Sequence, residues 1–398
     1  MLIPKYWAQH KQLFESMVDS NTGRTKAKKQ ATIKRYGWSD VSQSDALTHA
    51  KVRVNEAYKQ WLAGDDIMRR ERIEQYNDSN GIPIREQSIT EQNFFTDNST
   101  TQLIKTRNSY GAHVANVDNI AIIDVDNEDL LNCTQLTALE GHLQASMKPH
   151  VWGFVIASIV IASIIASLKI AWFWLILFMI PMVALLWRKA AKNERMQQHA
   201  NAQKLAELSS LMTKQLQQRV ANYPKESFRL YQTPAGFRLI ATHDTVLPND
   251  DVVGQWFAYF HADANYVRLC QMQQCFRARL TAKPWRMSEV TEQHILTKTI
   301  PHHDFFLMND VDDGLHHDSM DEMDDEQYAE FARQQANIAK RQQWIADYDT
   351  FAKNYKACRY LDRFGSPKRE DSATQKAINE FVEWHDKACQ VDKDLPMA

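Results

Sequence analysis

Apolar residues recur at helical spacing in several stretches of the chain, and polar residues fill the positions between them. The clearest stretch is residues 42–64, where Ser42 stands in the position of an N-cap and Gly64 ends the pattern. We therefore predict a helix there. Further helices are predicted at residues 189–223, 250–260, 326–356 and 372–391.

Short runs of β-branched and aromatic residues, separated by Asn, Gly, Pro and Asp, are typical of strands. In the first part of the chain we predict strands at residues 31–38, 69–77, 82–89, 101–111, 112–117 and 119–126. Residues 228–244 contain two such runs around Thr-Pro-Ala-Gly, the pattern of a β-hairpin. A further strand is expected within residues 265–287. The pattern predicts an α+β fold with a mainly antiparallel sheet.

The most apolar part of the chain is residues 151–187, in which Lys169 is the only charged residue. As one helix it would extend about 55 Å, whereas the hydrocarbon core of a bilayer is about 30 Å thick. Two helices of roughly 18 residues, 151–168 and 170–187, would each extend about 27 Å. We therefore predict a transmembrane helical hairpin that turns at Lys169, with the lipid bilayer as a partner.

The first predicted membrane helix carries a stripe of small residues, a pattern that lets two membrane helices approach closely. The stripe consists of Gly153, Ala157, Ser158, Ala162, Ser163, Ala166 and Ser167. It predicts contact with the second helix or a homodimer. Lys148 precedes the hairpin and RKAAKNER (188–195) follows it, so the positive-inside rule places both termini in the cytoplasm.

These patterns predict one discontinuous cytoplasmic domain that the transmembrane hairpin interrupts. The predicted regions are 1–149 and 189–300 as the two parts of this domain, 150–188 as the hairpin, 301–325 as an acidic loop and 326–398 as a helical region. The N-terminal residues contain no continuous apolar run, so we expect no signal peptide.

Charge is nearly balanced, with 47 Lys and Arg against 49 Asp and Glu, so composition gives no strong signal for nucleic acid. The five cysteines have no CxxC spacing, which favours reduced thiols, and Cys270 and Cys275 are interpreted as buried apolar residues rather than metal ligands. The acidic loop and its neighbouring histidine pairs, 302–303 and 316–317, leave cation binding open, although a solvated loop explains them as well.

Two carboxylates end the strand predicted at IIDVD. Because side chains alternate along a strand, Asp124 and Asp126 share one face. Such a pair can bind Mg²⁺ or Mn²⁺ and serve phosphoryl transfer, but aspartates at strand ends also simply begin turns.

Six basic residues, each near a glycine, a proline or an aromatic residue, are candidate ligands for an anionic small molecule or nucleotide. These residues are Arg107, Arg238, Arg277, Arg279, Lys283 and Arg286. The alternative is that each arginine pairs with an Asp or Glu across the sheet. Trp285 is interpreted either as a core residue or as a stacking surface.

The chain resembles an uncharacterised family of bacterial membrane proteins almost from end to end. The motifs that carry the resemblance are RYGWSD (35–40), IPIRE (82–86), TRNSYGA (106–112), IIDVD (122–126), YQTPAGFRLIATH (231–243), CFRARLTAKPWR (275–286), ACRYL (357–361) and WHDKA (384–388). The resemblance implies a bacterial inner-membrane location and a single domain on both sides of the hairpin.

A second resemblance is distant. The order of an acidic pair, a helix and a Thr-x-x-Gly hairpin is similar to the catalytic core of archaeo-eukaryotic primase-polymerases. In that family the acidic pair binds metal and the hairpin supplies a histidine to the nucleotide. Arg238 stands where that histidine would be.

Three hypotheses about function follow. The first is a membrane-anchored binding module for an anionic or nucleotide-like ligand. The second is a metal-dependent phosphoryl- or nucleotidyl-transfer enzyme that uses Asp124 and Asp126. The third is a structural membrane scaffold.

Overall fold

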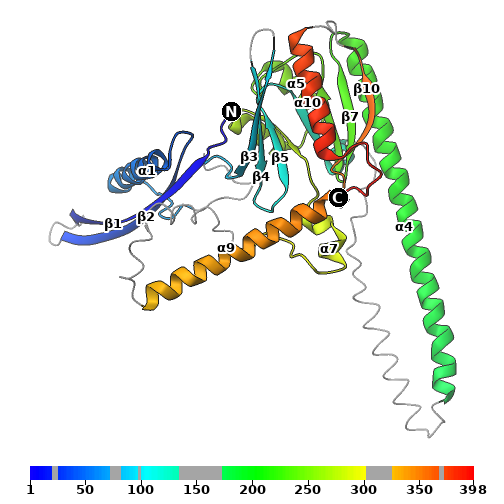
Figure 1. Ribbon diagram of the computed structural model, residues 1–398, viewed down its shortest axis with the longest axis horizontal. Coiled ribbons are helices and arrows are strands. Elements are labelled where there is room, and N and C mark those ends of the chain that lie inside the picture. The colour runs from blue at the N-terminus through cyan, green and yellow to red at the C-terminus, as the bar shows by residue number, and fades with distance from the viewer. Residues whose placement is uncertain (20–25, 72–81, 97–99, 134–172, 302–324, 367–371) are drawn as a thin grey trace. The chain divides into compact units, whose positions relative to one another are not determined.

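Figure 1 shows the computed structural model of the protein. It describes residues 1–19, 26–71, 82–96, 100–133, 173–301, 325–366 and 372–398. The chain is α+β, and its named strands pair antiparallel in three sheets rather than in the one sheet expected.

One sheet is a long hairpin of β1 (Tyr6–Asp19) and β2 (Lys26–Ser39). The second sheet has the strand order β10 (Arg359–Phe364), β7 (Phe228–Thr233), β8 (Gly236–Ala241), β6 (Ile122–Asp126). The third has the order β3 (Gln87–Phe95), β4 (Thr100–Arg107), β5 (His113–Val117), β9 (Phe276–Arg279). The single-sheet expectation is wrong because β5 and β6, neighbours in sequence, pair with β9 and β8 respectively.

The helices of the described residues are α1 (Gln43–Ala63), α2 (Asn127–Cys133), α4 (Phe173–Asn222), α5 (Asp251–Tyr259), α6 (Ala264–Gln273), α7 (Ser288–Thr291), α9 (Asp325–Phe351) and α10 (Ala373–Cys389). The predicted caps of α1 are confirmed. The Ser42 side chain accepts a hydrogen bond from the backbone N–H of Asp45, and Gly64 ends the helix with a φ of 95°. Neither β1 nor α6 was predicted from the sequence.

Contacts divide the chain into two compact units. Unit 1 consists of Met1–Asp126 and Val220–Ala398 and holds every named strand, whereas unit 2 is Asn127–Arg219 and holds α2 and most of α4. All the candidate site residues belong to unit 1.

The prediction of a transmembrane hairpin at residues 150–188 is wrong, because no helix of the described residues is both long and apolar enough to cross a membrane. In α4 the apolar residues from Phe173 to Trp187 lead without a break into Arg188 and a mostly polar remainder. The finding also corrects the description of the chain as an integral membrane protein.

The first predicted membrane helix, residues 151–168, lies outside the described residues together with its small-residue stripe. The homodimer expected through that stripe therefore stays a prediction, as does the location of both termini in the cytoplasm. Residues 302–324, which hold most of the acidic loop and its histidine pairs, also lie outside the described residues.

The predicted hairpin of β7 and β8 is confirmed, with Thr233 paired to Gly236 at its turn. A Cβ at Gly236 would lie 1.9 Å from the backbone oxygen of Val125, so only glycine allows β8 to lie this close to β6. This close pairing sets Asp124 opposite Arg238 in the register.

A cluster of buried residues attaches the segment after β9 to α9. Tyr348 of α9 donates a hydrogen bond to the backbone oxygen of Ala282 (2.6 Å), and Trp344 and Tyr348 pack with Met287 and Val290. These contacts fix the position of residues 283–286, which carry part of the candidate site.

Candidate functional site

The six basic residues singled out in the sequence fall into two groups of three. Arg107, Arg238 and Arg277 form ion pairs with acidic residues of unit 1. Arg279, Lys283 and Arg286 have no ion-pair partner among the described residues. We call the second group the basic cluster.

Arg107 is a structural residue. Its two terminal nitrogens lie 2.9 Å and 2.7 Å from the carboxylate oxygens of Asp349 on α9, and Nη1 also donates to the backbone oxygen of Gly111. Burial alone would raise the pKa of Asp349, but hydrogen bonds from His113 and Arg107 outweigh it and hold that pKa well below its ordinary value. Arg107 thus connects the turn after β4 to α9.

Arg238 is buried and faces Asp124 across the β6–β8 pair. Its Nε lies 3.2 Å from Oδ1 of Asp124, and Nη1 donates to the backbone oxygen of Arg279 at 3.0 Å. Burial lowers the pKa of Arg238, but Asp124, with further contributions from Cys358, Cys389 and Tyr266, outweighs that effect, and the pKa lies above its ordinary value. Arg238 therefore joins the two four-stranded sheets and remains charged.

Arg277 is the third paired arginine. Its Nη2 lies 2.5 Å from Oε1 of Glu86, and Nη1 donates to the side-chain oxygen of Gln273. Both members of the ion pair are buried, with exposed side-chain fractions of 6% for Arg277 and 1% for Glu86. Such a pair loses far more when one member is removed than it gains as an intact pair.

The basic cluster is built by the end of β9 and the short 3₁₀ helix of Pro284–Arg286. Arg279 closes β9, Lys283 is the N-cap residue of the 3₁₀ helix, and Arg286 is its last residue. Nε of Arg279 and Nη1 of Arg286 are buried atoms that have no hydrogen-bond partner in the described part of the chain. Buried donors of this kind are rare in proteins unless a bound water, ion or ligand accepts from them.

The charges of the three residues act on one another. Burial, together with the charges of Arg279 and Arg286, lowers the pKa of Lys283 to about 8, although Asp126 and Asp124 raise it. Burial and Arg279 likewise lower the pKa of Arg286 to about 10. The positive charges of these residues disfavour one another's protonated forms. A bound anion offsets this repulsion, so anion binding stabilises the charged cluster.

Two aromatic rings lie beside the basic cluster. Tyr110 and Trp285 meet edge to face with ring centroids 5.1 Å apart, and Nζ of Lys283 lies 5.5 Å from the Trp285 ring. Trp285 is 38% exposed, which leaves part of its ring free for contact. Tyr110 is placed by the turn at Gly111, where φ is +94° and a Cβ would lie 2.3 Å from the ring of Trp344.

Asp124 and Asp126, the expected pair of metal ligands, lie in different surroundings, and metal binding by them stays a prediction. Asp124 is neutralised by Arg238, and within unit 1 it belongs to no described group of three potential metal ligands. Asp126 is exposed and pairs in register with Gly236. Both carboxylates raise the pKa of Lys283, so their negative charges act on the basic cluster.

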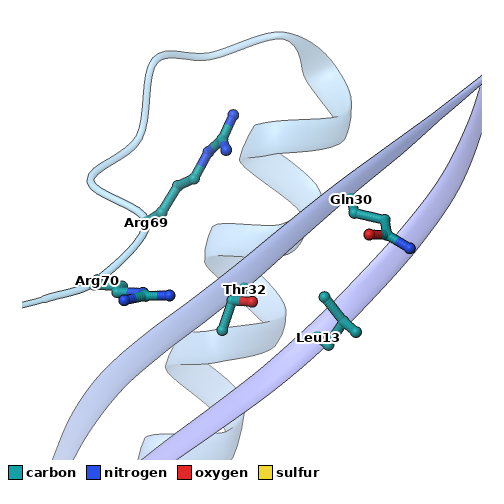
Figure 2. Close-up of a pocket in the computed structure, with 5 residues that line it drawn as sticks. All are labelled: Leu13, Gln30, Thr32, Arg69 and Arg70. Carbon is teal, nitrogen blue, oxygen red and sulfur yellow. The ribbon is translucent and has the colours of Figure 1, made fainter.

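An open pocket of about 560 Å³ lies elsewhere in unit 1, along the β1–β2 hairpin. Figure 2 shows its lining residues: Leu13, Gln30 and Thr32 extend from the two strands, and Arg69 and Arg70 from the segment after α1. None of the residues predicted to form a site lines it.

Sequence reasoning named the three members of the basic cluster but missed Tyr110. The available signal was its place in TRNSYGA, a tight turn that holds an aromatic residue between a strand end and a glycine. The same turn explains Arg107, which was assigned to the ligand but holds the turn instead.

Neither a family model, nor a curated protein, nor a solved structure matches this chain. The site must therefore be interpreted from its own geometry.

Proposed function

We propose that unit 1 is a binding module for an anionic, nucleotide-like ligand held by the basic cluster. The observation that carries the proposal is that Arg279 and Arg286 each have a buried nitrogen without an acceptor among the residues that the structure describes, beside a lysine whose pKa they lower. A phosphate group offers several acceptor oxygens and two or more negative charges, so one ligand group can satisfy all three cations.

The aromatic pair extends the proposal from a simple anion to a nucleotide. Trp285 is partly exposed and lies next to Lys283, so a base stacked on the indole places its phosphates near the cations. The paired arginines of the same region serve the fold, since Arg238 joins the two sheets and Arg277 pairs with the buried Glu86, and they leave the ligand to the three unpaired cations.

Thermal unfolding in the presence of a panel of anions tests this function. ATP and tripolyphosphate are expected to raise the melting temperature of the full chain more than sulfate at equal ionic strength, because a ligand that binds only the folded state stabilises it. The variant Arg279→Gln/Arg286→Gln is expected to lose that increase. Lys298→Gln/Arg363→Gln, which removes two exposed charges outside the cluster, is the matched control.

Equal shifts for the double variant and the wild type would exclude the basic cluster as the binding site. Equal shifts by ATP and tripolyphosphate would retain the anion site but exclude recognition of the base.

A further inference from the structure

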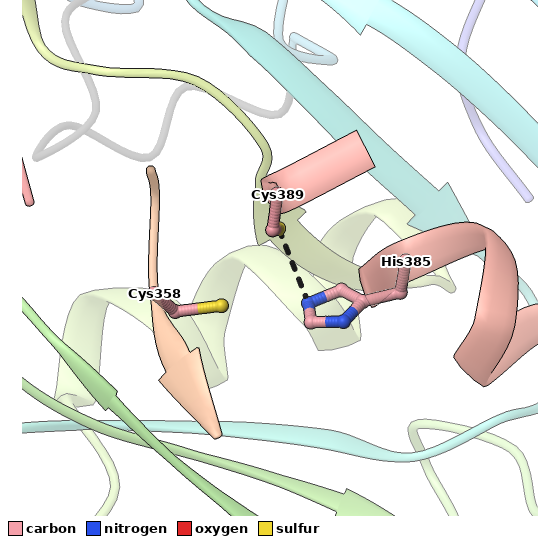
Figure 3. A group of neighbouring side chains, drawn as sticks. All are labelled: Cys358, His385 and Cys389. Carbon is pink, nitrogen blue, oxygen red and sulfur yellow. Dashed lines mark hydrogen bonds between the residues drawn. The ribbon is translucent and has the colours of Figure 1, made fainter. Parts of the chain in front are cut away.

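A second group of reactive side chains lies in the core of unit 1. Cys358, from the segment before β10, meets His385 and Cys389 of α10, and their ligand atoms all lie within 4.8 Å of one another (Figure 3). All three residues are completely buried, with exposed fractions of 0%. We call these residues the Cys–His cluster.

The backbone sets this convergence. His385 and Cys389 are four residues apart on α10, so they lie one turn apart on the same face, and Sγ of Cys389 is 3.5 Å from Nε2 of His385. The backbone N–H of Ala357 donates to the oxygen of Cys389 at 3.1 Å, which places Cys358 beside the end of the helix. The three side chains are thus held close together before any ligand binds.

The imidazole is oriented for coordination. Nδ1 of His385 lies 3.0 Å from Oδ1 of Asp386, whose other oxygen accepts from Arg229 at 2.9 Å. A carboxylate in this position keeps the proton on Nδ1 and leaves the lone pair of Nε2 directed at the thiols. Metal-bound histidines almost always have such a partner on their second nitrogen.

The surrounding charges suit a divalent ion. Arg238 contacts Nε2 of His385 at 3.2 Å, but its charge is already balanced by Asp124. Two thiolates and a neutral imidazole around a doubly charged ion add no net charge to this buried space. When a metal binds Nε2, Arg238 loses that hydrogen bond and keeps those to Asp124, to the backbone of Arg279 and to Sγ of Cys389.

We propose that the Cys–His cluster binds one thiophilic divalent ion of the zinc type, with Cys358, His385 and Cys389 as its protein ligands. Thiolate and imidazole are the ligands that zinc prefers, whereas Mg²⁺ and Ca²⁺ prefer oxygen. Three protein ligands leave the fourth tetrahedral position to a small ligand such as water. Binding displaces the protons of the thiols, so the ion replaces hydrogens with no change in oxidation state.

The test is a Co²⁺ titration of the metal-free, fully reduced full chain under anaerobic conditions. One equivalent of Co²⁺ is expected to give a thiolate-to-cobalt charge-transfer band and tetrahedral d–d bands, which one equivalent of Zn²⁺ removes. Cys358→Ser and Cys389→Ser are expected to lose the charge-transfer band. Cys270→Ser, a buried cysteine of α6 outside the cluster, is the matched control and keeps it.

A wild-type chain without a charge-transfer band, or an unchanged band in Cys389→Ser, would overturn the proposal. A decrease in mass by two hydrogens on exposure to air, without any Co²⁺ signal from the reduced chain, would also overturn the proposal. That result would favour a disulfide between Cys358 and Cys389. If the serine variants fail to fold by circular dichroism, Asp386→Asn decides, because it keeps every ligand. Its Co²⁺ affinity is expected to fall about 10–100-fold, and an unchanged affinity would contradict the proposal.

Discussion

Arg277 and Arg279 are two positions apart on β9, yet only Arg277 has an acidic partner. Glu86 neutralises Arg277 in the interior, whereas Nε of Arg279 is buried without any acceptor. Two side chains of the same strand face thus have opposite roles. Arg277 stabilises the fold, and Arg279 belongs to the basic cluster that we propose for ligand binding.

This difference predicts opposite effects on stability. Arg277→Ala removes the cation from its buried ion pair with Glu86 and is expected to lower the free energy of unfolding by about 3–5 kcal/mol. Arg279→Ala removes a charge that opposes protonation of Lys283 and is expected to leave that free energy unchanged or to raise it. Urea unfolding of both variants measures the contrast. Equal destabilisation by the two would contradict the division of the six basic residues.

The basic cluster also predicts a pH dependence of binding. In the free protein the pKa of Lys283 is about 8, and a bound anion raises it toward the ordinary value of 10.5. Binding therefore takes up a proton above pH 8, and the affinity is expected to fall by up to about tenfold per pH unit between pH 8 and 10.

Affinity measured by fluorescence between pH 6 and 10 tests this coupling. Lys283→Gln is expected to bind more weakly at pH 7 and to lose the decline above pH 8. A decline of the same size in that variant would assign the proton to another group.

Asp349 gives a second dependence on pH, this time in stability. Because Arg107 and His113 hold the pKa of its carboxyl below the ordinary 3.8, its contribution to stability is complete above that value and is lost as the pH falls below it. Asp349→Asn is expected to be less stable than the wild type by about 1.5–3 kcal/mol at pH 7. The difference should shrink at pH 3, and urea unfolding at both pH values would reveal a constant difference if this is wrong.

The aromatic pair predicts a specific loss for nucleotides. Trp285→Ala is expected to weaken ATP binding by about 1–3 kcal/mol, the range for one base stacked on an aromatic side chain. Tripolyphosphate has no base, so its affinity should not change. An equal loss for both ligands would show that Trp285 only supports the loop of the cluster, and quenching of the wild-type indole by ATP is an independent readout.

Local structure could be predicted where neighbouring residues decide it. Ser42 and Gly64 stand at the two ends of α1 as N-cap and C-cap, and Gly236 marks the turn of the β7–β8 hairpin. Hydropathy alone was misleading for residues 173–187, because an apolar run does not show where the helix that contains it ends. In the structure α4 continues from these residues far beyond Trp187, to Asn222.

The site could be predicted only in part. The division of the six basic residues into paired arginines and the basic cluster depends on contacts between residues that are distant in sequence. Arg107 and Arg277 were indistinguishable in sequence from Arg279, since their partners Asp349 and Glu86 lie 242 and 191 positions away. The Cys–His cluster shows the same limit. The spacing of its two α10 ligands is visible in the sequence, but the fold alone brings the third ligand from before β10.

Calorimetric titration of the full chain with ATP at pH 7 tests the central claim most directly, because it measures whether the basic cluster binds an anion at all. Saturable binding to one site is expected in the wild type and in the charge-matched control Lys298→Gln/Arg363→Gln. Binding by Arg279→Gln/Arg286→Gln is expected to be at least tenfold weaker, which corresponds to about 1.4 kcal/mol. Absence of binding to the wild type, or equal affinities for all three proteins, would contradict the central claim.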